Sequence, residues 1–393
     1  MLSPEGLPAI QAALDAADLD GWLLYDFRGA NPIAAGILQL DGLVTRRVFA
    51  YLPRHGTPTA VTHAIEQGPW SKWPSAWPRV VYSSWRELEA AVSGLVRGRR
   101  VAMEYSPGDA VPYVDRVPAG VLEMVRAAGA EVRSSGELVS RFYAVWTAGQ
   151  LAAHRRAATR IAEIGQEAQR RAGAAARRGE PVTEWELQQW ILDQFRRAGL
   201  ETLDPPIVAI GPHAANPHYA PGEASSAQIR SGDVLLVDLW AREPGEPFAD
   251  QTWMAVVGTA ADERTSAVWS AVRDARDAAI ALLRERAAAG RPVRGAEVDD
   301  AARGVIESRG FGRYFVHRTG HSIDPRDLHG SGPHIDNLES REERVLTPGV
   351  AFSIEPGIYI PDVLGARSEV NVIMADGEAI VTPDDYQREL PVV

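Results

Sequence analysis

The sequence predicts a mixed α/β (α+β) protein with a small N-terminal α/β domain over residues 1–145 and a larger domain over residues 146–393. A chain of 393 residues is long enough for two sizeable hydrophobic cores. Helical and strand-like segments alternate before residue 145. After it, pairs of long helical patterns alternate with strand hairpins, which favours two similar halves around a curved antiparallel sheet, although the sequence shows no clear internal repeat.

The elements of the N-terminal domain follow from apolar spacing. Helices are expected over Pro4–Ala17 and Trp85–Val96, where apolar residues recur at the helical period. Strands are expected over Gly21–Asp26, Arg46–Leu52 and Val101–Glu104, which are rich in apolar residues that favour strands. Together they indicate a small sheet with helices packed on it.

Four helices are expected in the second domain. A long helical pattern runs over Trp146–Arg178 and ends at the Gly-Glu-Pro sequence of residues 179–181. Thr183 is a suitable N-cap for a second helix over residues 184–198. Two further helices are expected over residues 261–288 and 295–309, each between groups of strands.

The composition excludes several classes of protein. Apolar residues make up 45% of the chain and charged residues 24%, as in ordinary globular domains. There is no cysteine, which excludes disulfides, thiolate ligands and cysteine nucleophiles. A net charge of −11 argues against a nucleic-acid partner. The acidic, amphipathic N-terminus and the lack of a long apolar run predict a cytoplasmic protein that does not engage a membrane.

Two aspartates flank a predicted hairpin. The apolar run Val234–Val237 leads into Asp238, a turn-rich stretch follows, and Asp250 precedes the strand-like run Thr252–Val257. Pairing of the strands would bring the two carboxylates together although they are 12 residues apart. Taken alone, the pair is more typical of two solvated acids beside a turn.

Histidines cluster further along the chain. His317 and His321 are four residues apart, and the approach over Tyr314–Val316 predicts a strand that runs into a loop at Gly320. His329 and His334 follow, so that four of the nine histidines fall within 18 residues. Such clustering favours a binding or catalytic site over solvated loop residues.

Two glutamates lie in apolar surroundings near the C-terminus. Glu355 interrupts an apolar strand pattern, and Glu369 opens another. A buried carboxylate is costly unless it is paired or binds metal, so the simpler alternative is an ion pair with an arginine such as Arg367. Four carboxylates and one imidazole, however, suit two adjacent divalent cations, because the carboxylates balance the charge and can bridge the metals.

These motifs resemble the pita-bread metallopeptidases, which include methionine aminopeptidase, aminopeptidase P, prolidase and the creatinase relatives. The resemblance covers residues 150–393 and rests on V-D-L-W, A-D-Q-T-W, H-R-T-G-H, I-E-P-G-I-Y and R-S-E-V. The segment A-N-P-H-Y resembles the motif of the family's additional active-site histidine, which implies that role for His218 rather than for the neighbouring His213. The long N-terminal domain resembles prolidase and aminopeptidase P more than methionine aminopeptidase.

The chain departs from the family pattern at one position. The family's second catalytic histidine follows the ligand histidine at a fixed short distance, and the best match, His329, is one residue too far from His321 and precedes Gly330 instead of an acid. A one-residue bulge over residues 324–326 would absorb the difference. His334 is the alternative.

The resemblance implies a pita-bread fold and two divalent metal ions per chain, manganese, cobalt or zinc, bridged by Asp250 and Glu369. The implied metal ligands are Asp238, Asp250, His321, Glu355 and Glu369. A water shared by the two metals would be deprotonated near neutral pH and would attack a peptide carbonyl. His218 or His329 would then stabilise the oxyanion, and Glu355 would carry a proton to the leaving amine.

The local sequences L-L-Y-D-F-R-G and H-G-S-G-P-H-I-D-N resemble bacterial Xaa-Pro dipeptidases. The implied substrate is a small peptide with proline at its second position, and the implied assembly is a homodimer. His317 is expected on the proline side, and Arg367 is expected to bind the substrate carboxylate. Asp26 and Arg46 of the N-terminal domain, from the same or a partner subunit, are expected to reach over the site, and Tyr386 is expected to close it.

Three other functions remain open at this point. Aminopeptidase P would release the first residue from longer Xaa-Pro peptides. Creatinase-type enzymes share the fold but work without metal, and the five intact ligands argue against them. A non-catalytic pita-bread module would bind a protein partner, but such modules typically lose ligands.

Overall fold

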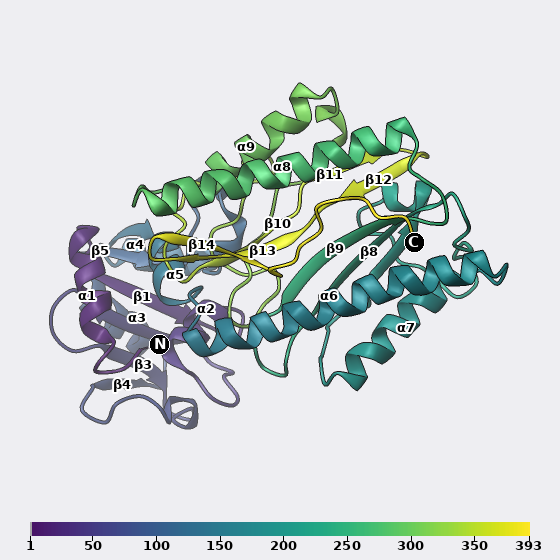
Figure 1. Cartoon of the computed structure of the whole chain (residues 1–393). Coiled ribbons are helices and arrows are strands. Elements are labelled where there is room, and N and C mark those ends of the chain that lie inside the picture. Colours follow the sequence, from purple (N-terminus) through teal and green to yellow (C-terminus); the bar gives the residue numbers. More distant parts are fainter. Residues whose placement is uncertain (1) are drawn as a thin grey trace. The chain divides into compact units, whose positions relative to one another are not determined.

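The computed structural model describes residues 2–393 as two compact units, one up to Tyr143 and one from Ala144 onward. Both are mixtures of helices and strands (Figure 1), which confirms the predicted fold class. Within residues 2–393, no helix combines the length and the apolar character needed to cross a membrane.

The N-terminal unit is built on one six-stranded sheet with the order β4-β3-β2-β1-β5-β6. The central strands β1 and β2 are antiparallel, whereas β5 and β6 run parallel. The strands are β1 Gly21–Asp26, β2 Val48–Pro53, β3 Thr59–His63, β4 Arg79–Tyr82, β5 Arg100–Met103 and β6 Glu131–Ser134. The helices are α1 Leu7–Ala16, α2 Pro32–Leu38, α3 Trp85–Val96, α4 Ala119–Ala127 and α5 Gly136–Phe142, with short 3-10 turns η1 Gly68–Trp70, η2 Pro107–Asp109 and η3 Pro112–Val114.

Side-chain alternation along β1 explains why both faces of this sheet are covered. Trp22 and Leu24 pack into the core with α1, α2 and α5, while Leu23 and Tyr25 pack into the core with α3 and α4. The predicted strand at β1 and helix at α3 are confirmed to the residue. The first helix begins at Leu7 rather than at Pro4, because a turn capped by the Ser3 hydroxyl precedes it.

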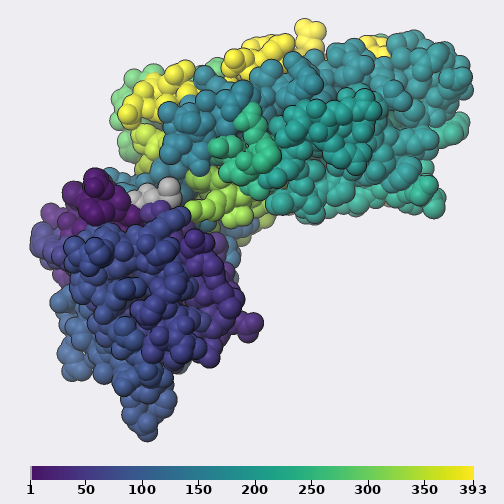
Figure 2. Space-filling view, turned by 90° about the horizontal axis from the view of Figure 1, so that it is seen from below, coloured from purple at the N-terminus to yellow at the C-terminus, as the bar shows by residue number. Residues whose placement is uncertain are grey.

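The C-terminal unit places two pairs of helices on opposite sides of its strands (Figure 1). The helices are α6 Ala148–Arg177, α7 Glu184–Arg197, α8 Glu263–Ala288 and α9 Gly295–Ser308, with 3-10 turns η4 Gly211–Ala215 and η5 Gly312–Tyr314. All four helices match the expected ranges within a few residues. Thr183 caps α7 as predicted, and Glu186 completes a capping box. In Figure 2, the blue-teal atoms of α6 and α7 cover a broad part of the face of this unit.

Eight strands form three antiparallel sheets in the C-terminal unit, in the orders β7-β8-β9, β10-β13-β14 and β11-β12. They are β7 Ile207–Ile210, β8 Val234–Ala241, β9 Ala249–Val256, β10 Ala351–Ile354, β11 Gly357–Ile360, β12 Leu364–Arg367, β13 Val370–Ala375 and β14 Glu378–Thr382. The predicted β8–β9 hairpin is confirmed. The strand predicted over Tyr314–Val316 is wrong, because the chain there leaves a 3-10 turn and Val316 is 59% exposed.

The alternation of side chains along β8 and β9 separates the core from the site. Leu235, Val237 and Leu239 pack in the core that α6 and α7 cover. Asp238 and its neighbours at even positions therefore lie on the other face of the strand. The same period places Asp250 and Thr252 on one face of β9, opposite the Trp253 side chain that packs in the α6–α7 core.

Candidate metal centre

The β8–β9 register brings the two hairpin aspartates together. Asp238 pairs with Thr252 and Trp240 pairs with Asp250, so the two aspartates are diagonal neighbours on one face of the hairpin. Each aspartate is only 5% exposed. The Asp250 amide donates to the side-chain oxygen of Asn371 at 2.9 Å, which connects β9 to β13.

His321 lies on a segment that runs beside β10. The His321 amide donates to the Ser353 hydroxyl at 2.9 Å, and the Ser353 amide donates to the His321 carbonyl at 2.9 Å. The preceding residue must be glycine, because a Cβ atom at Gly320 would lie 1.9 Å from the Ser353 carbonyl oxygen. This close approach sets the position from which the imidazole reaches the aspartates.

The two glutamates occupy breaks between strands. Glu355 lies between β10 and β11, and Glu369 lies between β12 and β13. Glu355 was expected inside a continuous strand, but it follows the last residue of β10. Glu369 was expected to open a strand, but it immediately precedes the first residue of β13. Apolar periodicity does not mark such a break, because residues on both sides of it are buried.

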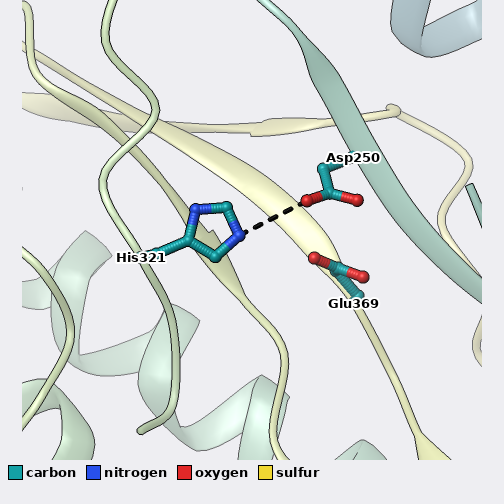
Figure 3. Close-up of side chains that lie close together, drawn as sticks. All are labelled: Asp250, His321 and Glu369. Atoms are coloured by element: carbon teal, nitrogen blue, oxygen red, sulfur yellow. Dashed lines mark ion pairs between the residues drawn. The ribbon is translucent and has the colours of Figure 1, made fainter. Parts of the chain in front are cut away.

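The five side chains converge on one buried point of the C-terminal unit. Ligand atoms of Asp250, His321 and Glu369 all lie within 4.8 Å of one another, and Figure 3 shows the three side chains turned toward each other. His321 Nε2 lies 3.4 Å from Asp250 Oδ2 and 3.5 Å from Glu355 Oε1. Asp238 joins the group through the Thr252 hydroxyl, which lies 3.3 Å from Asp238 Oδ1 and 2.8 Å from Glu369 Oε2.

Crowding of buried carboxylates perturbs their proton affinities. Burial raises the pKa of Asp238 to about 7, although the Arg367 guanidinium opposes this shift. Burial and the charge of Glu355 raise the pKa of Asp250 to about 8. Burial, reinforced by Asp250, also raises the pKa of Glu369 well above its usual value. Removal from water is thus the main cause that disfavours the charged form of these three carboxylates, and repulsion from neighbouring carboxylates adds to it.

The donor set fits divalent cations. Asp250 Oδ1 is buried and has no hydrogen-bond partner among the described residues. Burial lowers the pKa of His321, which favours the neutral imidazole that binds metals. A buried acceptor without a donor, beside mutually repelling carboxylates and a neutral imidazole, is the environment that an oxygen-preferring cation would stabilise.

Arg367 is engaged with this cluster. Its guanidinium pairs with Asp238 Oδ2, donates from Nε to the Thr252 hydroxyl at 2.9 Å, and donates to the Tyr359 hydroxyl at 3.3 Å. The arginine is 5% exposed. The sequence suggested Arg367 both as the ion-pair partner of a buried carboxylate and as the partner of the substrate carboxylate. In the structure Arg367 pairs with Asp238, a candidate ligand, and also lines the cavity.

The cluster opens into a cavity of about 500 Å³. Besides the carboxylates and His321, three histidines contribute to its wall: His218, His317 and His329. The remaining lining residues are Ile207, Pro217, Trp240, Val316, Arg318, Leu328, Glu339 and Arg367. His317 Nε2 lies 2.8 Å from the Tyr359 hydroxyl, which fixes the ring at the edge of the cluster.

The structure distinguishes His329 from His334. The His329 ring packs on the His321 ring at 4.2 Å between centroids and lines the cavity. His334 is fully buried away from the lining, where its Nδ1 accepts from the Ser322 amide. A turn absorbs the extra residue before His329, since the Asp324 carboxylate accepts from the amides of residues 326 and 327. This turn replaces the expected strand bulge.

Three other predicted site residues are not among those that line the cavity. Tyr386 belongs to the apolar core of the C-terminal unit, with Arg276 over its ring at 4.8 Å, and it does not line the cavity. Asp26 and Arg46 belong to the N-terminal unit. The Asp26 carboxylate is buried and accepts from the amides of Gly29 and Asn31, and Arg46 is exposed and donates to the Thr45 hydroxyl.

Several residues at the site were not singled out from the sequence. Thr252, Ser353 and Asn371 each lie two positions from a candidate ligand and hydrogen-bond within the cluster. A strand period of two would have identified them, since residues i and i+2 share a face. The period of two does not mark Tyr359 and Arg318. Only the folded chain brings Tyr359 to His317 and Arg367, and Arg318 to the cavity.

Comparison with known proteins is consistent with this geometry. An Xaa-Pro dipeptidase of Lactobacillus helveticus is 34% identical over 185 residues, which are 47% of this chain and 46% of the relative. The probable dipeptidase PepE of Mycobacterium tuberculosis is 36% identical over 188 residues, or 48% of this chain and 46% of that protein. The chain thus spans about half the length of the curated relatives it matches.

A solved structure covers nearly the whole chain. The dipeptidase PepE from Mycobacterium ulcerans superposes with a TM-score of 0.75 at 26% identity, over 99% of this chain and 97% of that one. The C-terminal unit accordingly has the pita-bread fold. The family model described as metallopeptidase family M24 matches residues 152–376. The chain therefore belongs to this family.

Proposed function

From membership of metallopeptidase family M24, we propose that the chain is an Xaa-Pro dipeptidase that uses two divalent cations. The observation that carries the proposal is the convergence of three buried carboxylates, the partly buried Glu355 and His321 beneath a cavity lined by three more histidines. The similarity to an Xaa-Pro dipeptidase supports the choice of substrate.

The five clustered side chains would hold the cations. Asp250 and Glu369 would bridge them, because each carboxylate lies at the centre of the cluster and has two oxygens to share. Asp238 would be a further ligand of one cation. His321 and Glu355, whose Nε2 and Oε1 atoms lie 3.5 Å apart, would be further ligands of the other. When bound, such a pair of cations polarises a carbonyl oxygen and lowers the pKa of a shared water.

The histidines of the wall would assist as neutral hydrogen-bond donors. Interaction with the neighbouring His321 imidazole lowers the pKa of His329 to about 3, with desolvation adding to the shift, so His329 is neutral near pH 7. His218 lines the same cavity from the loop that follows β7. Either residue could donate to the oxyanion that forms when the peptide carbonyl is attacked, which is a role that does not require a net charge.

We expect Glu355 to take part in proton transfer as an ionised carboxylate. Burial alone would raise this pKa, but His321, Arg367 and His317 together lower it. The carboxylate is therefore ready to accept a proton. Cleavage before proline releases a secondary amine that must be protonated, and Glu355 is placed to pass the proton on.

The cation that meets the substrate carboxylate is proposed to be Arg318. Arg318 and Arg367 both line the cavity, but Arg367 is buried against Asp238, Thr252 and Tyr359. Arg318 lies at the wall beside Glu339, 3.9 Å from its carboxylate. The free C-terminal carboxylate of a dipeptide substrate could accept a charge-assisted hydrogen bond from the Arg318 guanidinium.

A paired assay tests the proposed substrate. Ala-Pro and Ala-Pro-Ala are compared with and without added manganese. A dipeptidase should cleave Ala-Pro with a kcat/KM at least about a hundredfold higher, because the longer peptide lacks a carboxylate at the position of Arg318. Equal or faster cleavage of Ala-Pro-Ala would instead assign the chain as an Xaa-Pro aminopeptidase, and no cleavage of either would reject both assignments.

A further inference from the structure

We infer that Glu184, at the start of α7, is the positioning residue that holds the His218 loop against the cavity. This inference rests on the proposed function, in which His218 donates to the reacting carbonyl oxygen. Glu184 touches neither the cavity nor the carboxylate cluster. Its carboxylate instead binds both ends of the segment that carries His218.

The Glu184 carboxylate is fully buried and accepts from four groups. Two are backbone amides, those of Ile210 at the end of β7 and of Ala227, each at 2.9 Å. Two are side chains, the Tyr219 hydroxyl at 2.7 Å and His213 Nδ1 at 2.9 Å. A single carboxylate thus links α7 to four points of the chain between residues 210 and 227.

His218 lies between the two side chains that Glu184 holds. The rings of His213 and Tyr219 stack at 4.5 Å between centroids, which closes the loop on itself. Within the loop, the Asn216 side-chain oxygen accepts from the His218 amide at 3.1 Å. The backbone at His218 is therefore fixed on both sides, while its imidazole lines the cavity.

The opposite side of the loop is closed by β12. A Cβ atom at Gly365 would lie 1.7 Å from the Ala214 carbonyl oxygen, so the loop packs directly on this strand. Glu184 and β12 therefore hold the loop between them. Loss of the carboxylate bonds would leave the contact with β12 and the bond from the Glu184 amide to the Ala227 carbonyl. It would remove the link from α7 to residues 210, 213 and 219.

The chemistry at this position requires a carboxylate. Four donors need an acceptor-only group with two oxygens, and a glutamine would turn an N–H₂ group toward at least one of them. The loop would then shift or become mobile. A displacement of about 1 Å at a catalytic group can cost on the order of a hundredfold in rate, so a residue that touches no substrate can still affect turnover strongly.

The first experiment compares Glu184→Gln with a matched control, Glu186→Gln. Glu186 lies on the same turn of α7 but bonds only to the helix N-cap residue. We expect Glu184→Gln to keep the wild-type metal content and KM and to lose at least about tenfold in kcat on Ala-Pro. Glu186→Gln should keep wild-type kcat. A wild-type kcat in Glu184→Gln would overturn the inference.

A double-mutant cycle separates positioning from general destabilisation. If Glu184 acts through His218, Glu184→Gln should cause no further loss of kcat in a His218→Ala background. The same tenfold loss in both backgrounds would contradict the inference. If Glu184→Gln does not fold, Tyr219→Phe removes one of the four bonds, and its smaller loss of kcat should likewise disappear in the His218→Ala background.

Amide hydrogen exchange tests the inference without an activity assay. In Glu184→Gln, amides of residues 211–227 should exchange at least about tenfold faster than in wild type, while those of β8 and β9 should not change. Unchanged exchange over the loop would overturn the proposed link. If the wild-type chain cleaves no Xaa-Pro peptide, the proposed function fails, and this measurement alone decides whether Glu184 holds the loop.

Discussion

Glu104 of the N-terminal unit and the carboxylate cluster of the C-terminal unit lie in opposite environments. In the N-terminal unit, Glu104 is fully buried and accepts from Trp22 Nε1 at 2.6 Å, Asn31 Nδ2 at 2.9 Å and the Ser135 hydroxyl at 3.1 Å. In the C-terminal unit, four carboxylates face one another, and one oxygen of Asp250 has no partner among the described residues.

The difference separates a structural carboxylate from a binding site. Neutral donors satisfy Glu104 inside the protein, so it needs nothing from outside. The C-terminal cluster has Arg367, the Thr252 hydroxyl and few other donors for four carboxylates, which leaves negative charge that bound cations would balance. The following predictions test this contrast, beginning with the largest expected effect.

Removing one charge from the cluster should abolish function. Asp250→Asn should lower kcat/KM by at least about a thousandfold, roughly 4 kcal/mol, and reduce bound metal, because a bridging carboxylate is lost. The control is Glu104→Gln, a change of the same kind in the other unit, which should keep its metal. Two metals per chain and near-normal activity in Asp250→Asn would show that the contrast between the units is wrong.

A cavity residue outside the cluster should affect turnover but not metal content. His218→Ala should lose about a hundredfold to a thousandfold in kcat, the usual effect of losing one oxyanion donor, and keep its metals. Metal analysis and steady-state kinetics of the same sample measure both. If metal content fell together with activity, His218 would be a ligand and the cluster would be larger than described.

A matched pair of buried threonines compares the units directly. Thr252 lies in the cluster and Thr62 in the N-terminal unit, where it hydrogen-bonds to Glu66 and Trp70. Thr252→Val should weaken metal binding by about 10- to 100-fold, because the hydroxyl orients a candidate ligand. Thr62→Val should leave metal affinity unchanged. Equal metal affinities in the two variants would show that Thr252 does not contribute to the metal site.

The stability of the N-terminal unit should depend on pH through Glu104. Burial raises its pKa from 4.5 to about 7. The folded chain therefore keeps this proton where the unfolded chain has lost it, so the contribution of Glu104 to stability is fully present below about pH 4.5 and is lost as the pH rises to about 7. The loss is on the order of 3 kcal/mol.

Urea unfolding of the manganese-loaded chain measures this effect, because bound metal suppresses the titration of the cluster. Glu104→Gln should flatten the decline in stability between about pH 5 and 7. An unchanged decline in that variant would mean that other groups cause it.

Local features of the fold could be predicted from the sequence, because they depend on neighbours along the chain. The β8–β9 hairpin and the Thr183 cap follow from turn residues and apolar spacing. The geometry of the site was harder to predict from the sequence. The ligand motifs pointed to the five residues, but Glu355 and Glu369 lie in breaks between strands that periodicity does not reveal.

The substrate contacts predicted for Arg367 and Tyr386 show where local patterns stop being informative. Each residue has a partner that is distant in sequence. Arg367 pairs with Asp238, and Tyr386 packs under Arg276. Such pairings depend on how the strands and helices pack, so no local sequence pattern predicts them. The turn at Asp324 also depends on the folded structure. It brings the His329 ring onto the His321 ring, and this contact cannot be predicted from the residues of the turn alone.

Anomalous diffraction from crystals of the manganese-loaded protein tests the proposed dinuclear centre most directly. The arrangement of the cluster predicts two manganese peaks per chain at the base of the cavity, with Asp250 and Glu369 each contacting both ions and His321 contacting one. No peak within the cluster, or a single ion that leaves Asp250 and Glu369 without shared contacts, would contradict the proposed centre.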